Sequence, residues 1–178
     1  MSKNIVVEGL DGTGKSTLAS ALHQNNPSAL KFVSEGPATP NEFWRRNAIL
    51  RELCESKSDV ICDRHPAISE HVYGDICRNT GPLIRSHLVI ALLEEHSIDR
   101  IVYCRSRLST LKIEARDDDS DREMTELVKK NLMFLHFRYE ALMALLKERF
   151  EVMEIDALHT DPNKNAKLTT HSLYHSND

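Results

Sequence analysis

The chain has 178 residues, of which 40% are hydrophobic and 28% are charged, as in ordinary soluble globular proteins. This length fits one domain with a full core. The net charge of −4 excludes the global basic field that holds nucleic acid regardless of sequence, although a local basic groove remains compatible with it. Because no apolar run is long enough to cross a membrane and no signal-like segment precedes the first apolar run, we expect a cytoplasmic protein without a membrane partner.

Short apolar runs alternate with segments of helical periodicity. The predicted buried strands are Ile5–Val7, Leu30–Val33, Val60–Cys62, Ile101–Cys104 and Val152–Ile155. The predicted helices are Ser16–Gln24, Asn41–Cys54, Leu83–His96 and Met124–Arg149. The alternation predicts an α/β fold in which helices cover both faces of a parallel sheet. Residues 1–158 form one predicted domain, and the polar residues 159–178 are predicted to be a weakly held tail with room for one turn of helix.

The cysteines and histidines give no indication of a metal site. The four cysteines form no C-x-x-C pair, and the nine histidines are scattered without ligand spacing. Cys62 and Cys104 lie inside apolar runs. We therefore predict reduced thiols in the core.

Residues 9–16 form a complete phosphate-binding motif that matches G-x-x-x-x-G-K-[ST] at every fixed position. Three glycines let the backbone turn and bring its N–H groups up to a polyphosphate: Gly9, Gly12 and Gly14. Lys15 supplies a cation for the outer phosphates, and the Ser16 hydroxyl can ligate Mg²⁺. Since a strand precedes the motif and a helix follows it, the sequence predicts a nucleoside triphosphate site.

Charged residues follow two other strands, at the edge of the sheet where ligands bind in parallel folds. Asp63 and Arg64 end the third strand, where a carboxylate can hold the water shell of Mg²⁺ or accept a proton and an arginine can bind a phosphate. Glu35 follows the second strand, with Trp44 on the next helix. Glu35 is a candidate general base, and a merely solvated strand end is an equally good interpretation.

The charged segment 112–122 lies after the fourth strand and is predicted to be an exposed loop. In a kinase such a loop can also be a lid that closes over the phosphates and contributes an arginine. Arg116 and Arg122 are the candidates. The run of aspartates between them disfavours phosphate, so part of the loop must face away.

Two segments, VEGLDGTGKST at 7–17 and DRHPAISEHVYG at 63–74, resemble the thymidylate kinase group of P-loop nucleoside and nucleotide kinases, and especially its compact phage-type members. The resemblance spans about residues 3–156, but only these two motifs are specific. It implies a five-stranded parallel sheet of order 2-3-1-4-5 and an ATP-dependent kinase that uses Mg²⁺. A phage-encoded protein would work in the host cytoplasm.

The resemblance also implies roles for single residues. ATP phosphates and Mg²⁺ would be bound by the loop residues Gly9, Asp11, Gly12, Thr13, Gly14, Lys15, Ser16 and Thr17, with Asp63 as a further metal ligand. Asp11 would also face the acceptor sugar, Asp63 and Arg64 would act at the reacting phosphates, and Tyr73 would shape the acceptor pocket. From its position on the helix after Glu35, we also count Trp44 among the acceptor-binding candidates. Gly12 stands where some members of the family carry a catalytic arginine. The chain therefore resembles the subgroup in which the lid supplies that arginine, which favours Arg116 and Arg122 as candidates.

The acceptor is where this chain departs from thymidylate kinases. Their arginine after the second strand is missing from Ser34-Glu35-Gly36-Pro37, and the next arginine is Arg45. A glutamate there resembles deoxynucleoside kinases, in which a hydroxyl acceptor needs a base. The prediction therefore leans to the hydroxyl of 5-hydroxymethyluracil in phage DNA, a DNA-modification reaction with Arg45, Arg46 and Arg51 as candidate backbone contacts. The acidic net charge and Asp11, whose family partner is a free sugar hydroxyl, argue against it.

Two other functions remain open. Phosphorylation of dTMP or another deoxynucleoside monophosphate is the close alternative. A nucleotide switch or non-transferase ATPase is the remote one, because the chain lacks an Asn-Lys-x-Asp motif and its third strand ends in Cys62-Asp63-Arg64 rather than in an aspartate–glutamate pair. The sequence leaves the oligomeric state open, with a homodimer among the options.

Overall fold

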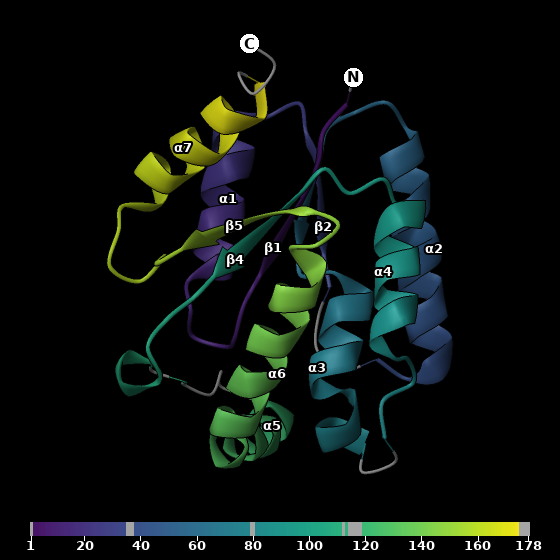
Figure 1. The fold of residues 1–178 in the computed structure, drawn as a ribbon, viewed down its shortest axis with the longest axis vertical. Coiled ribbons are helices and arrows are strands. Elements are labelled where there is room, and N and C mark those ends of the chain that lie inside the picture. The colour runs from purple at the N-terminus through teal and green to yellow at the C-terminus, as the bar shows by residue number, and fades with distance from the viewer. Residues whose placement is uncertain (1, 35–37, 79–80, 112, 114–118, 175–178) are drawn as a thin grey trace.

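A parallel five-stranded sheet forms the centre of the molecule in a computed structural model that describes residues 2–34, 38–78, 81–111, 113 and 119–174 (Figure 1). Its strands are β1 (Asn4–Glu8), β2 (Leu30–Val33), β3 (Val60–Asp63), β4 (Arg100–Cys104) and β5 (Glu151–Ile155). They lie in the order β2-β3-β1-β4-β5, and every neighbouring pair is parallel. The predicted fold class and strand order are confirmed.

Helices cover both faces of this sheet (Figure 1). The described helices are α1 (Lys15–Asn25), α2 (Pro40–Glu55), α3 (Pro66–Arg78), α4 (Ser86–Glu95), α5 (Asp119–Lys130), α6 (Leu132–Leu146), α7 (Pro162–Tyr174) and the short 3₁₀ turn η1 (Leu108–Thr110). Alternate residues of β1 point to opposite faces of the sheet. Ile5 and Val7 belong to the core shared with α1 and α7, whereas Val6 belongs to the core shared with α2, α3, α4 and α6. This alternation is the period-2 geometry of a strand buried on both faces.

The helix expected over Met124–Arg149 is two helices, α5 and α6, separated at Asn131. The Asn131 side-chain amide donates to the Leu127 carbonyl at 2.8 Å, so it competes with the backbone ladder and interrupts the helix. Helix α5 also begins at Asp119, inside the segment expected to be a loop. The single-helix expectation was therefore wrong.

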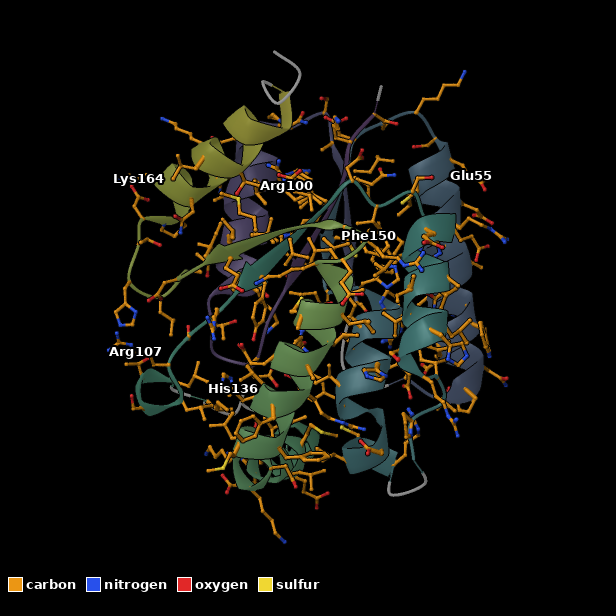
Figure 2. The ribbon with its side chains drawn as sticks, in the orientation of Figure 1. Glu55, Arg100, Arg107, His136, Phe150 and Lys164 are labelled. Atoms are coloured by element: carbon orange, nitrogen blue, oxygen red, sulfur yellow. The ribbon has the colours of Figure 1, made fainter. Side chains whose placement is uncertain are left out.

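The tail expectation was also wrong, because α7 is a 13-residue helix that packs against α1. Its buried face is made of small or polar residues, Asn165, Ala166 and Thr169. The fully buried Arg100 donates to the Thr169 carbonyl at 2.7 Å and pairs with Glu151 of β5. Figure 2 shows Arg100 beside α7. These contacts hold the C-terminal segment on the sheet despite its polar composition.

Two further sequence observations have structural counterparts. The four cysteines are free, and Cys62 and Cys104 are buried as predicted. Within the part of the chain that the structure describes, no helix is long and apolar enough to cross a membrane.

Candidate active site

The carboxyl ends of the central strands meet at one edge of the sheet. Asp63 at the end of β3 lies opposite Val7 of β1 on one side and Val33 of β2 on the other. The loop after β1 and the turn after β3 therefore emerge side by side. This is the edge at which parallel α/β sheets bind their ligands.

The loop between β1 and α1 has a backbone that requires glycine. Gly12 and Gly14 have φ angles of 79° and 80°, in the left-handed region. Gly9 has a φ of 151°, and a Cβ there would lie 2.5 Å from the Cys104 carbonyl oxygen. At Gly14 a Cβ would lie 3.3 Å from the Ala157 carbonyl oxygen. The loop is thus wedged between β4 and the segment after β5, with its last glycine at the start of α1.

Lys15 begins α1 and turns its side chain back along the loop. Its Nζ donates to the Leu10 carbonyl at 3.0 Å and lies 3.4 Å from Asp11 Oδ1. Burial, helped by the nearby positive charge of Arg64, lowers the pKa of Lys15 to about 8. The Thr13 hydroxyl also donates to Leu10 O, at 2.8 Å. The loop is therefore stabilised by hydrogen bonds from its own side chains and from Lys15.

Asp11 and Arg64 form an ion pair that joins the loop to the end of β3. Although burial alone would raise it, the pKa of Asp11 is held below its usual range by Arg64 and Lys15. Arg64 has a left-handed φ of 68°, and its guanidinium carbon lies 5.5 Å from the centre of the Tyr73 ring on α3. Asp11, Lys15, Arg64 and Tyr73 thus form one cluster.

Asp63 and Ser16 offer oxygen atoms suited to Mg²⁺. Asp63 is buried, and among the described residues its Oδ1 has no hydrogen-bond partner, which leaves a carboxylate oxygen available to a ligand. Ser16 is exposed at the first turn of α1, as is Thr17. Carboxylate and hydroxyl oxygens fit a hard cation that keeps several of its waters. No group of three or more His, Cys, Asp or Glu side chains with metal-site geometry occurs in the described ranges.

The other candidate residues lie on helices α2 and α5 or outside the described residues. Glu35 and Arg116 belong to the latter group. Arg122 is exposed on α5. Trp44 is 51% exposed on α2 and meets the Phe43 ring edge-on at 4.8 Å. The structure therefore brings together the loop, Arg64 and Tyr73, whereas the ring contact of Trp44 is with Phe43.

A buried residue missed by sequence reasoning, Glu8, lies beneath the cluster at the end of β1. Its Oε1 accepts the backbone N–H of His65 at 2.6 Å, and its Oε2 accepts the Tyr139 hydroxyl at 3.0 Å. Burial raises the pKa of Glu8 to about 7, although Arg64 opposes this effect. A glutamate that ends an otherwise apolar strand directly before a phosphate-binding loop is the pattern that could have identified it.

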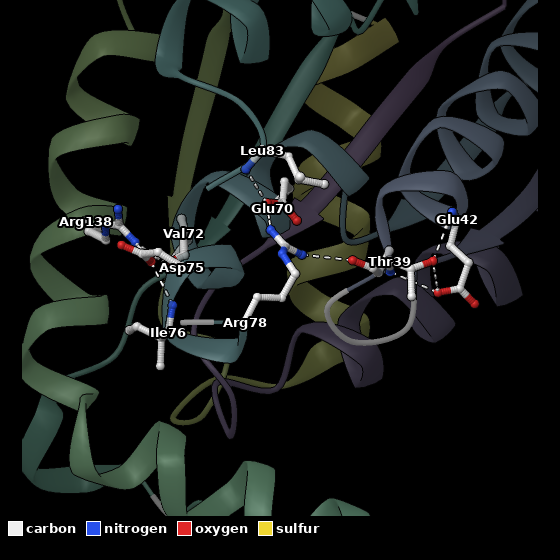
Figure 3. A network of polar contacts seen from close by, with 10 residues as sticks. Thr39, Glu42, Glu70, Val72, Asp75, Ile76, Arg78, Leu83 and Arg138 are labelled. Atoms are coloured by element: carbon white, nitrogen blue, oxygen red, sulfur yellow. Dashed lines mark hydrogen bonds and ion pairs between the residues drawn. The ribbon is translucent and has the colours of Figure 1, made fainter. Parts of the chain in front are cut away.

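Helix α3 is braced by polar contacts with the residues before α2 and with the segment that follows α3 (Figure 3). Glu70 pairs with Arg78 and accepts the Leu83 backbone N–H at 2.8 Å, while Arg78 donates to the Ala38 carbonyl at 2.8 Å. Gly74 lies between the two charged side chains, and a side chain there would collide with both. The brace fixes α3, and with it Tyr73, relative to the start of α2.

Solved structures of three proteins share this architecture over nearly their whole length. The YorR protein of Bacillus subtilis, in complex with phosphorylated GDP, has a TM-score of 0.66 at 14% identity, covering 99% of both chains. Deoxyadenosine kinase of M. mycoides has a TM-score of 0.57 at 17% identity, covering 96% of this chain and 98% of its own. Thymidylate kinase of Ehrlichia chaffeensis has a TM-score of 0.51 at 16% identity, covering 97% of this chain and 98% of its own. The chain has the fold of nucleotide and deoxynucleoside kinases.

At these identities the similarity establishes the fold alone. No known protein family's sequence profile matches the chain, and no curated protein matches it in sequence. Function must therefore be argued from the site.

Proposed function

We propose that the protein is a kinase that transfers the γ-phosphate of ATP, with Mg²⁺, to a pyrimidine deoxynucleoside or deoxynucleotide. The observation that carries the proposal is the cluster in which Lys15, Asp11 and Arg64 converge beside Tyr73. Lys15 and the loop N–H groups suit the donor phosphates, and Arg64 suits the charge that develops during transfer. Because Arg64 contacts both Asp11 of the loop and the Tyr73 ring, it connects the donor side of the proposed site with the acceptor side.

In the proposed site each remaining residue has a limited task. Ser16 and Asp63 hold Mg²⁺ and its waters, which supplies the neutralisation that the triphosphate needs. Asp11, ionised and paired with Arg64, faces a sugar hydroxyl of the acceptor, and the Tyr73 ring packs against the base. Glu35 takes the proton of the acceptor hydroxyl, and Arg116 or Arg122 completes the charge stabilisation from the lid.

A free acceptor is favoured because the cluster is enclosed. Tyr73 is 4% exposed and the Arg64 side chain 17% exposed. Of the three arginines that could contact a DNA backbone, Arg51 is engaged by Glu95 at 3.0 Å.

The hydroxyl of 5-hydroxymethyluracil in DNA is the second candidate acceptor. It is favoured by the exposed Arg45 on α2 and by the absence of an arginine from residues 34–37 of the sequence. If the free acceptor is a deoxynucleoside monophosphate and not a deoxynucleoside, Arg64 would bind the acceptor phosphate.

The test is an acceptor panel with labelled ATP: pyrimidine deoxynucleosides, dTMP, and an oligonucleotide containing 5-hydroxymethyluracil. The proposal predicts label on a free nucleoside or nucleotide, and label only on the oligonucleotide would transfer the assignment to the DNA acceptor. If the acceptor is a hydroxyl, Glu35→Gln should lower turnover by roughly two orders of magnitude. Glu52→Gln, on the exposed part of α2, is the matched control and should leave it unchanged.

A further inference from the structure

Glu8 is held in the interior at the junction of three elements. The residue is fully buried at the end of β1, immediately before the phosphate-binding loop. One carboxylate oxygen accepts the His65 N–H of the turn after β3, and the other accepts the Tyr139 hydroxyl of α6. Since both oxygens are engaged and neither is exposed, Glu8 cannot reach a substrate. Any contribution to transfer must act through the residues that it holds.

The turn that Glu8 holds has a strained backbone. Arg64 has a φ of 68°, a conformation that L side chains other than asparagine and aspartate rarely adopt. Three of the hydrogen bonds that hold this turn involve the backbone of Arg64 and the N–H of His65. The Arg64 N–H donates to Val7 O at 3.0 Å, the Cys62 thiol donates to Arg64 O at 2.9 Å, and the His65 N–H donates to Glu8. The bond to Glu8, at 2.6 Å, is the shortest of the three and the only one whose acceptor is a side-chain oxygen.

The direction of the Arg64 side chain depends on that turn. With φ in the left-handed region, the guanidinium lies against Asp11 and the Tyr73 ring. If the His65 N–H lost its acceptor, a buried donor would be unpaired, and the turn could relax to an ordinary φ. Relaxation would move the Arg64 side chain away from Asp11.

The Tyr139 ring connects the same carboxylate to the acceptor side of the cluster. It packs edge-on against Tyr73 at 6.0 Å between ring centres and stacks on Tyr103 at 5.9 Å. Glu8 therefore contacts both the turn that carries Arg64 and the aromatic group that backs Tyr73.

We propose that Glu8 is a positioning residue for phosphoryl transfer, which holds Arg64 in its productive direction through the hydrogen bond from His65 N–H. This inference rests on the proposed kinase function. The role requires an oxygen at this position that accepts a hydrogen bond, but it does not require a negative charge. A substitution that keeps the acceptor and removes the charge therefore distinguishes this role from an electrostatic one.

Glu8→Gln and Glu8→Met form the decisive pair, because they are similar in size and only glutamine keeps an acceptor for His65. We expect Glu8→Met to lower kcat by about tenfold to a hundredfold with KM for ATP within about twofold, and Glu8→Gln to remain within about fivefold of the parent kcat. Tyr139→Phe removes the other hydrogen bond and should keep kcat within about threefold. Equal losses in Glu8→Gln and Glu8→Met would overturn the proposal, as would a Glu8→Met variant with full turnover.

Amide hydrogen exchange at His65 tests the same hydrogen bond without an activity assay. The proposal predicts slow exchange in the parent and in Glu8→Gln, and fast exchange in Glu8→Met. Fast exchange in the parent would contradict it, and this comparison of parent with Glu8→Gln remains decisive if Glu8→Met fails to fold. If the parent transfers phosphate to no acceptor while His65 remains protected, the proposed function fails and the structural role of Glu8 does not.

Discussion

Lys15 shows how one side chain can be prepared for a ligand. Its side chain is buried and donates to the Leu10 carbonyl, and its pKa is lowered to about 8. A bound triphosphate would add negative charge beside the amine and raise that pKa. At a pH above about 8, Lys15 must therefore take up a proton when ATP binds, so the affinity for ATP depends on pH.

The first prediction is that ATP binds progressively more weakly as the pH rises above 8, by up to about tenfold per pH unit. Calorimetric titration with Mg-ATP across this range measures the effect. In Lys15→Arg, whose guanidinium stays charged, the affinity should be lower but nearly independent of pH. A parent affinity that is unchanged one pH unit above the lysine pKa would refute this account of Lys15.

At the same scale, part of the site was predictable because its motif fixes local geometry. Gly9 directly follows β1, Gly14 and Lys15 lie at the start of α1, and Asp63 ends β3 with Arg64 directly after it. Glu8 was missed because one of the hydrogen bonds that its buried carboxylate accepts comes from the Tyr139 hydroxyl, and Tyr139 is distant in sequence. Pattern reasoning detects neighbours along the chain and not such long-range hydrogen-bond partners.

Among the elements, α7 is the clearest departure from expectation. Its sequence contains few large apolar residues, but Asn165, Ala166 and Thr169 share one face at helical spacing and are buried. The preceding Asp161 accepts the Asn163 N–H at 2.9 Å, which makes Asp161-Pro162 a helix start. These small side chains allow α7 to approach α1 closely, and the hydropathy of the sequence does not predict that contact.

The second prediction tests this packing. Ala166→Asp should destabilise the protein by about 2–4 kcal/mol, because it places an unpaired carboxylate at a fully buried position. Lys167→Asp, one residue further on the exposed face, should change the free energy of unfolding by less than about 0.5 kcal/mol. Urea unfolding measures both variants. Equal and small effects would mean that α7 does not contribute to the folded core.

For the molecule as a whole, buried titratable groups link stability to pH. The pKa of Glu8 is raised from 4.5 to about 7, so the folded protein binds this proton more tightly than the unfolded chain does. The stabilising contribution of Glu8 is therefore fully present below pH 4.5 and is lost as the pH rises through 7. Burial beside His96 lowers the pKa of His65, so its contribution is instead present above pH 6.5 and lost at lower pH.

The third prediction isolates the Glu8 contribution by comparison with Glu8→Gln, in which His65 is retained. The difference in free energy of unfolding between parent and variant should shift against the parent by roughly 1–3 kcal/mol between about pH 5 and about pH 8. Urea unfolding at several pH values between these limits gives the curve. A difference that is constant with pH would show that Glu8 titrates normally in the folded state.

Also at this scale, the layering of helices agreed with expectation because alternating apolar runs and helical segments favour a parallel sheet covered on both faces. The strand order agreed as well, but that expectation came from the resemblance of two motifs to thymidylate kinases and not from the pattern of runs. The acceptor does not follow from the same reasoning. Two of the residues proposed to act at the acceptor, Glu35 and Arg116, lie outside the described residues, and chain patterning does not specify how they would meet Tyr73 on α3.

The central claim is that the cluster of Lys15, Asp11 and Arg64 performs phosphoryl transfer. The most direct measurement is the fate of the γ-phosphate of labelled ATP, with Mg²⁺ and a pyrimidine deoxynucleoside or deoxynucleotide, in the parent protein and in Lys15→Ala. We predict acceptor-dependent formation of a labelled nucleotide that is abolished in Lys15→Ala and by chelation of Mg²⁺. Release of label only as inorganic phosphate, at a rate that no nucleoside, nucleotide or DNA acceptor changes, would contradict the account and identify the protein as an ATPase.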